Sequence, residues 1–203
     1  MTHLTPDPDA MLAHLQHLFG DARDGLVEIA FTSPDGPDLE NARQFDVADL
    51  DGAAEFAAER NAERRNVSVG AALRKPGTPR FKRGNLEHVY AASAVWCDID
   101  DGEAARLAEP VWQEREQPTL CIVTGRHPDL RLHAYWRLLE PITCPGEVKG
   151  LNERLQIAFG GDPHVLHASV LMRLGGSIAW PIKPGRVPEL TEVHGAPDLC
   201  PIP

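Results

Sequence analysis

The sequence contains no run of apolar residues approaching the roughly 20 that a membrane-spanning helix needs. Its first residues include Asp7 and Asp9, and no basic stretch precedes an apolar run, so the start is not typical of a secretory signal peptide. These absences favour a cytoplasmic protein that makes no membrane contact.

Closely spaced cysteines are also missing. The four cysteines lie far apart and no two of them form a CxxC pair, so neither a zinc ribbon nor a disulfide framework is predicted. With 203 residues the chain has room for one domain, which could fold as two lobes around a cleft and bury a core without such covalent support.

An overall positive charge is lacking too. The net charge of −10 argues against a protein that coats nucleic acid nonspecifically, because such binding depends on cations that neutralise phosphates. The charge is segregated, however, since Glu63 is the single acid among eight basic residues between positions 60 and 83. These are Arg60, Arg64, Arg65, Arg74, Lys75, Arg80, Lys82 and Arg83. The part after residue 74 has no apolar periodicity and is predicted to be an exposed, mobile loop.

Hydrophobic periodicity predicts alternating strands and helices along the rest of the chain. Together they indicate an α+β or α/β fold built on a mixed or antiparallel sheet. The predicted helices cover 11–19, about 52–65, about 103–116 and 145–159, and the predicted strands cover 26–31, 67–73, 89–100, 119–124 and about 131–139, with short strands near residues 171, 178 and 187.

The strongest local pattern is an apolar strand that ends in two acids, Asp98 and Asp100. Because side chains alternate along a strand, these acids project from one face, while Val95, Cys97 and Ile99 project from the other. Two carboxylates this close repel each other unless a cation lies between them, and a hard ion such as Mg²⁺ is the usual partner. The alternatives are an ordinary acidic turn or the DxD motif of glycosyltransferases and some phosphatases.

A second strand carries a polar face. Period two places Leu132, Ala134, Trp136 and Leu138 on one side of it, and Arg131, His133, Tyr135 and Arg137 on the other. Such a polar face is costly to bury, so it lines solvent or an anion site, unless the histidine is merely structural.

A third group follows the last long helix. Asp162 comes directly after Gly160-Gly161 and, taken alone, is an ordinary turn residue. Further on, glycines near Arg173 would let the backbone approach a phosphate, with Lys183 and Arg186 as countercharges.

The order of these motifs resembles the primase-polymerase branch of the archaeo-eukaryotic primases, found in plasmid and phage replication proteins. That family has an apolar strand with DxD or DxE, a second strand with a histidine, and a later acid, which match Asp98-Ile99-Asp100, His133 and Asp162. Its other motifs match Thr124-Gly125, His133-Ala134-Tyr135-Trp136, Arg173-Leu174-Gly175-Gly176 and Lys183. Arg131 stands where many relatives carry serine. The resemblance spans about residues 26 to 193.

The resemblance implies one primase-polymerase catalytic domain over 1–203. It would comprise an RRM-like catalytic lobe at about 89–196 and a smaller N-terminal αβ lobe at about 1–88 that carries the basic loop. The implied activity is that of a DNA primase or DNA-directed polymerase, a nucleotidyltransferase that makes a primer or extends a strand on single-stranded DNA by two-metal catalysis. A helicase domain or protein of the same replication system is an implied partner.

The resemblance also implies a role for each group of residues. Asp98, Asp100 and Asp162 would bind two Mg²⁺ or Mn²⁺ ions, and His133 would join them as a catalytic residue. Nucleoside triphosphate would contact Thr124, Gly125, Arg131, His133, Tyr135, Arg173 and Lys183. The DNA template would follow Arg74, Lys75, Arg80, Lys82 and Arg83.

Two other classes of function remain open at the level of sequence. A DxD-type glycosyltransferase would use Asp98 and Asp100 with Mn²⁺ on a nucleotide sugar. A non-catalytic module that binds nucleic acid or nucleotide would keep the basic loop and have no metal-dependent activity.

Overall fold

The computed structural model describes residues 4–33, 36, 38–39, 41–106, 108 and 117–195. Residues 102–106 are helical, as predicted, whereas most of the remainder of the helix predicted at 103–116 lies outside the described residues. No helix in the described ranges is both long and apolar enough to cross a membrane.

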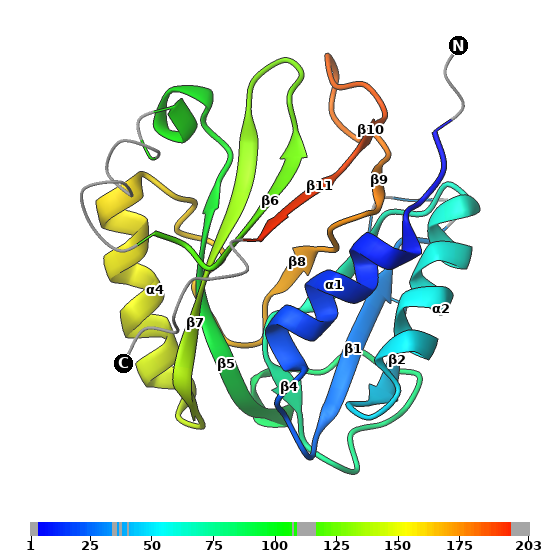
Figure 1. Ribbon diagram of the computed structural model, residues 1–203, viewed down its shortest axis with the longest axis vertical. Coiled ribbons are helices and arrows are strands. Elements are labelled where there is room, and N and C mark those ends of the chain that lie inside the picture. The colour runs from blue at the N-terminus through cyan, green and yellow to red at the C-terminus, as the bar shows by residue number, and fades with distance from the viewer. Residues whose placement is uncertain are drawn as a thin grey trace.

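A single antiparallel sheet forms the centre of the molecule (Figure 1). Its strands follow the order β11-β6-β7-β5-β4-β1-β3-β8, and β2 pairs with β1 outside this path. The strands are β1 (Leu26–Phe31), β2 (Asn41–Asp46), β3 (Val67–Gly70), β4 (Leu73–Arg74), β5 (Val89–Ile99), β6 (Leu120–Gly125), β7 (Arg131–Ile142), β8 (Leu171–Arg173) and β11 (Glu192–Gly195). A separate small ribbon pairs β9 (Ile178–Ala179) with β10 (Glu189–Leu190). The predicted α+β class with an antiparallel sheet is therefore confirmed.

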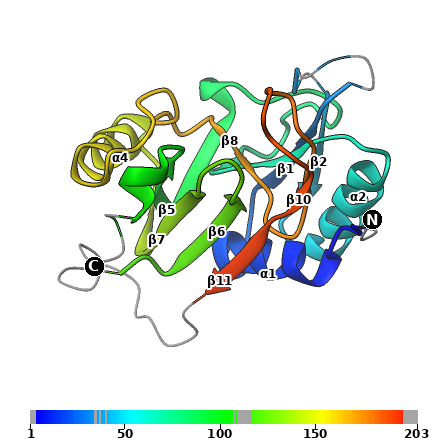
Figure 2. The ribbon, with the colours of Figure 1, turned by 90° about the horizontal axis from the view of Figure 1, so that it is seen from above.

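Helices cover both faces of this sheet, as the two views of the ribbon show (Figures 1 and 2). On one face α1 (Pro8–Phe19) lies beside α2 (Leu50–Ala62), and on the other α4 (Pro145–Phe159) packs against β5 and β7. A short 3₁₀ turn (Leu86–His88) precedes β5. Local sequence sets the helix ends: the Asp7 carboxylate accepts a hydrogen bond from the Ala10 N–H at 3.0 Å, and Gly160 ends α4 with a φ of 69°.

The predicted alternation of side chains along β5 and β7 is confirmed. Cys97 and Ile99 pack with the other apolar side chains of that face beneath α4, where the Trp136 ring stacks on Phe159 at 5.4 Å between centroids. The intervening side chains Trp96 and Tyr135 belong to the larger core beneath α1. Each strand therefore contributes to two cores, and the acidic and histidine positions fall on the α1 side.

Three predictions about strands differ from the structure. β2 was not predicted, because its apolar residues are interrupted by Arg43 and Gln44. The predicted strand 67–73 is split in two, and β1 pairs with both pieces. The strand expected near residue 187 lies instead at Glu189–Leu190, because Pro188 lacks the N–H that a paired strand requires.

The pairing of β8 crosses the predicted boundary between the two lobes. This strand falls within the range expected for the catalytic lobe, but it pairs with β3 of the N-terminal half. Since β4 pairs with both β1 and β5, one sheet runs through both halves. The division into lobes near residue 88 remains a prediction.

A buried ion pair lies at the junction of the two halves. The side chains of Glu28 and Arg74 are both fully buried, and Arg74 Nε lies 2.5 Å from Glu28 Oε2. The guanidinium also donates to the carbonyls of Ala72 and Ser169 at 3.2 Å each, while Glu28 Oε1 accepts from the Gly84 N–H at 3.1 Å. The prediction that Arg74 contacts a DNA template is therefore wrong, because its charge is used inside the protein.

We expect Glu28→Gln to lower the free energy of unfolding by about 3–5 kcal/mol, because it leaves the buried Arg74 cation without a counterion. Urea unfolding measures this. The matched control is Asp46→Asn, which removes the acid from a surface pair with Arg80, a kind of pair worth at most about 1 kcal/mol. Equal losses in the two variants would contradict the role of the buried pair.

Candidate functional site

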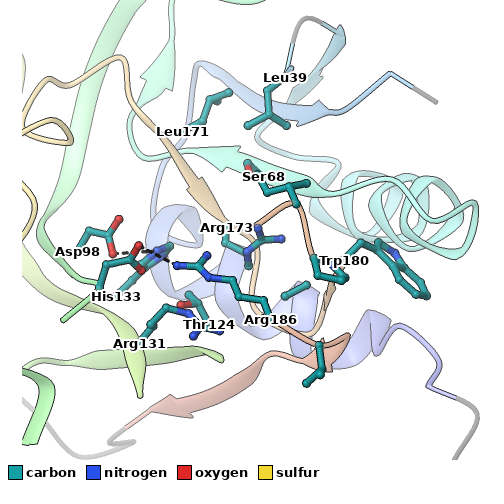
Figure 3. A pocket seen from close by; sticks show the side chains of 15 residues that line it. Leu39, Ser68, Asp98, Thr124, Arg131, His133, Leu171, Arg173, Trp180 and Arg186 are labelled. Carbon is teal, nitrogen blue, oxygen red and sulfur yellow. Dashed lines mark hydrogen bonds and ion pairs between the residues drawn. The ribbon is translucent and has the colours of Figure 1, made fainter. Parts of the chain in front are cut away.

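A cavity of about 230 Å³ opens where β3, β5, β6, β7 and β8 meet (Figure 3). Its polar lining combines two acids with three arginines, and its remaining wall is largely apolar. The polar residues are Ser68, Asp98, Asp100, Thr124, Arg131, His133, Arg173 and Arg186, and the apolar ones include Leu39, Leu171, Trp180 and Ile182.

The acidic side is formed by Asp98 and Asp100, at and just beyond the end of β5. Asp98 is the register partner of His133 on β7, and its Oδ1 lies 3.5 Å from His133 Nε2. Burial, then the charges of Asp100 and Asp162, raise the pKa of Asp98 to about 7. Its Oδ1 is buried without a hydrogen-bond partner in the part of the chain that the structure describes. A proton or a cation would relieve this carboxylate.

His133 is held neutral beside that acid. Burial, followed by the repulsion of Arg173, lowers the pKa of His133 to about 3. The contact with Asp98 is therefore not a pair of opposite charges at neutral pH. A neutral imidazole can still donate one hydrogen bond to an anion in the pocket.

The basic side brings three guanidinium groups toward the same space, as Figure 3 shows. Burial, then repulsion by Arg186 and Arg131, lower the pKa of Arg173 to about 10. Arg186 lies 3.3 Å from Asp100, and Arg131 lies 3.3 Å from the Glu189 carboxylate. Cations that repel one another in this way form a site that an anion would stabilise.

Asn66, which sequence reasoning missed, orients this basic side. Its side-chain oxygen accepts hydrogen bonds from Arg173 Nη1 at 2.7 Å and from the Trp180 N–H at 3.0 Å. It thereby joins the guanidinium to the apolar wall of the pocket. No local motif signals this role, which depends on residues more than 100 positions apart in the sequence.

Of the ten residues predicted to be catalytic or to bind nucleotide, six line the pocket, and Gly125, Tyr135, Asp162 and Lys183 do not. Gly125 lies beside the lining, Lys183 is exposed on the loop that leads to Arg186, and Tyr135 is fully buried. The predicted direct contact of Tyr135 with nucleotide is therefore corrected, because its side chain packs beneath the pocket against α1.

Asp162 lies next to the acidic side without joining it. Its backbone N–H donates to the Asp98 carbonyl at 2.7 Å, while its carboxylate accepts from the His164 N–H at 2.8 Å. Within the described ranges, no group of three or more His, Cys, Asp and Glu side chains is arranged to hold a metal ion. The predicted set of three acidic ligands is not assembled in this arrangement.

His14 on α1 lies beneath the pocket and was also missed. Its ring meets the edge of Tyr135 at 5.3 Å between centroids, and its Nδ1 accepts a hydrogen bond from the Gly175 N–H at 3.0 Å. Burial, then the proximity of His133 and His17, lower the pKa of His14 to about 3. The sequence shows only a histidine within a helix, which gives no signal of this contact.

Comparisons with known proteins identify the fold. No family model matches the chain, and no curated protein matches it. Among solved structures it is similar to the AEP domain of the primase-polymerase of cyanophage S-2L, at 18% identity and a TM-score of 0.66, covering 98% of this chain and 95% of that one. It is also similar to primase RepB′, at 13% sequence identity and a TM-score of 0.61, and this match covers 92% of this chain and 56% of that one.

A third similar structure is the catalytic domain of primase RepB′ in complex with initiator DNA. It shares 15% identity and a TM-score of 0.57, and the match covers 85% of this chain and 79% of that one. TM-scores of 0.57 to 0.66 show a shared fold, and at such low sequence identities they show the fold alone. The chain thus has the fold of primase and primase-polymerase domains, as the sequence motifs predicted.

The neutral buried state of His14 predicts a dependence of stability on pH. Between pH 6.5 and about 3 the unfolded chain binds a proton at His14 that the folded chain does not, so the free energy of unfolding falls as the pH drops through this window. Below about pH 3 this group causes no further loss.

We expect His14→Asn to flatten that dependence by up to about 1.4 kcal/mol per pH unit, since asparagine can accept from Gly175 but does not titrate. Urea unfolding at a series of pH values measures the difference between variant and parent. Replacing the exposed His164 by asparagine is the control. Parallel curves for parent and His14→Asn would show that His14 is not held neutral.

Proposed function

We propose that the chain is a template-dependent nucleotidyltransferase that makes or extends a strand on single-stranded DNA. The observation that carries this proposal is the pocket, in which the acidic pair of Asp98 and Asp100 faces three arginines. The fold supports it, because a solved domain of the same fold holds initiator DNA. Phosphoryl transfer needs positioning and charge stabilisation more than a dedicated base, and this pocket offers both.

A divalent cation fits the acidic side. Asp98 has a buried, unpartnered oxygen and a pKa raised to about 7 by burial and neighbouring acids, which is the state that a hard cation would relieve. Asp98 and Asp100 would hold Mg²⁺ or Mn²⁺. Asp162 could contribute to binding a second ion after releasing its hydrogen bond to His164. When bound, the metal would lower the pKa of the primer 3′-hydroxyl and neutralise charge on the leaving pyrophosphate.

The basic side would bind the triphosphate. Arg131, Arg173 and Arg186 present guanidinium donors suited to phosphate oxygens, and the neutral His133 adds one N–H donor. The aromatic and aliphatic wall formed by Leu171, Trp180 and neighbouring side chains offers apolar surface for the rest of the nucleotide.

The template would follow the basic loop at 75–83. Lys75, Arg80, Lys82 and Arg83 are exposed there, and among them stands Phe81, whose side chain is 81% exposed. An exposed aromatic ring between cations is suited to single strands, because bases stack on the ring while cations follow the phosphates. Arg83 donates to the Leu39 carbonyl at 3.2 Å, and Leu39 lines the pocket, so the loop adjoins the site.

We expect Asp98→Asn to lower nucleotide incorporation by at least about 100-fold, because metal stabilisation of the transition state is worth several kcal/mol. Labelled nucleotide, a single-stranded template and Mg²⁺ or Mn²⁺ measure the activity, with and without a primer. Asp101→Asn is the control, since this neighbouring exposed acid does not line the pocket. Full activity of Asp98→Asn with unchanged melting would exclude the acidic pair from the site.

The same assay separates the other classes of function. Binding of nucleotide and template without incorporation would identify a non-catalytic binding module. Transfer from a nucleotide sugar in the presence of Mn²⁺ would identify a glycosyltransferase.

The loop is tested by single-strand binding at several salt concentrations. Arg80→Gln with Lys82→Gln should reduce the slope of log affinity against log salt by about 1.4, at roughly 0.7 per phosphate contact. Phe81→Ala should lower affinity by about 1–3 kcal/mol with little change in slope, because stacking releases no counterions. The control, Lys149→Gln with Arg154→Gln on α4, removes the same charge elsewhere. Equal slopes in all variants would show that the template does not follow this loop.

A further inference from the structure

Unpaired polar atoms are concentrated beneath the pocket. Six buried side-chain nitrogen or oxygen atoms in the described part of the chain have no hydrogen-bond partner. Four of them belong to neighbouring residues: Asp98 Oδ1, His133 Nδ1, the Tyr135 hydroxyl and His14 Nε2. Buried polar groups are nearly always paired in native proteins, by protein atoms or by ordered water, so this concentration indicates a bound polar partner.

The protonation of His14 follows from one hydrogen bond. Its Nδ1 accepts from the Gly175 backbone N–H at 3.0 Å, so Nδ1 carries no proton. In the neutral ring the proton is then on Nε2. His14 therefore presents an N–H donor within the core, where the structure gives it no acceptor among the described residues.

Tyr135 lies between the two histidines. Its ring meets His14 at 5.3 Å and 63°, and His133 at 6.4 Å and 74°, both edge to face. The Tyr135 hydroxyl can both donate and accept a hydrogen bond, so it can belong to a hydrogen-bond network that connects the two histidines. His133 and Tyr135 are two residues apart on β7, so their side chains lie on the same face of the strand. His133 lines the pocket, and Tyr135 lies beside it in the core.

The state of His133 depends on which of its nitrogens carries the proton. Its Nε2 is the nitrogen on the pocket side, 3.5 Å from Asp98 Oδ1. To donate to a carboxylate or a phosphate oxygen, Nε2 must carry the proton, and Nδ1 must then accept a hydrogen bond from within the core. Fixing that second hydrogen bond is the usual way in which a protein selects a histidine tautomer.

We propose that Tyr135 and His14 are positioning residues that, through one bound water molecule, donate a hydrogen bond to His133 Nδ1 and hold its Nε2–H toward the pocket. One water can satisfy all three unpaired atoms, since a buried water makes about three hydrogen bonds. The proposal concerns the free protein, and it rests on the proposed function only for its effect on catalysis.

The first experiment reads the tautomer of His133 directly from the ¹⁵N chemical shifts of its ring in the labelled protein. The parent should show the Nε2–H tautomer. Tyr135→Phe, which removes only the hydroxyl, should shift the His133 ring signals toward a mixture of tautomers. Tyr90→Phe is the matched control, because it removes the hydroxyl of the other tyrosine, which is 38% exposed at the start of β5.

His14→Asn provides an independent variant. Asparagine can still accept from the Gly175 N–H but has no donor at the position of Nε2, so it should perturb the same His133 signals. If this variant fails to fold, Tyr135→Phe decides the question alone. A parent protein with the Nδ1–H tautomer, or His133 shifts that are unchanged in Tyr135→Phe, would overturn the proposal.

Catalysis supplies a second measurement. If the chain incorporates nucleotide, Tyr135→Phe should lower kcat by about threefold to tenfold, the worth of one hydrogen bond, with an unchanged melting temperature. An unchanged kcat would overturn the catalytic consequence. A parent without activity would overturn the proposed function instead, while the tautomer measurement would still decide whether Tyr135 and His14 position His133.

Discussion

The buried pair of Glu28 and Arg74 is the interaction on which the geometry of the site depends. Arg74 ends β4, the two-residue strand that joins β1 to β5 and so connects the two halves of the sheet. Its guanidinium also binds the Ser169 carbonyl, just before β8, and β8 carries Arg173 into the pocket. A buried pair of charges is costly unless every group is satisfied, and here backbone donors and acceptors complete it. The pair thus ties β4, which connects β1 to β5, to the segment just before β8, the strand that carries Arg173.

Charge couples the two sides of the pocket. Asp98 and Asp100 repel each other, and Arg173 is destabilised by Arg131 and Arg186, so like charges crowd together within each side. The contact between Arg186 and Asp100, at 3.3 Å, is the direct link between the sides. A cation bound to the acids would release Arg186 for an anion, and an anion bound to the arginines would favour a cation on the acids. A metal ion bound together with a triphosphate satisfies both conditions at once, whereas either alone leaves one side uncompensated.

The sequence was sufficient to predict what depends on local pattern. Period two along β5 and β7 correctly divided their side chains between two faces, because the pleat fixes that alternation wherever the strand lies. The sequence did not predict the burial of Arg74 and Tyr135, because that burial is decided by partners distant in the sequence: Glu28 for the arginine and α1 for the tyrosine. Asn66 and Leu39 could not be assigned to the site for the same reason, since only tertiary packing brings them to it. Charge alone is thus a poor guide to exposure.

The interactions of the basic residues at 74–83 also affect how this acidic protein could bind DNA. Arg74 is buried, Arg80 pairs with Asp46, and Arg83 donates to a backbone carbonyl, so much of the positive charge in this segment is already engaged within the protein. With a net charge of −10 over the whole chain, long-range attraction to phosphates is weak. Affinity on the proposed function must then come from short-range contacts, namely stacking on the exposed Phe81, phosphate contacts of the loop cations and phosphate binding in the pocket. On the proposed function a template would be held where the loop and the pocket contact it, while the acidic remainder of the chain would limit nonspecific coating of DNA.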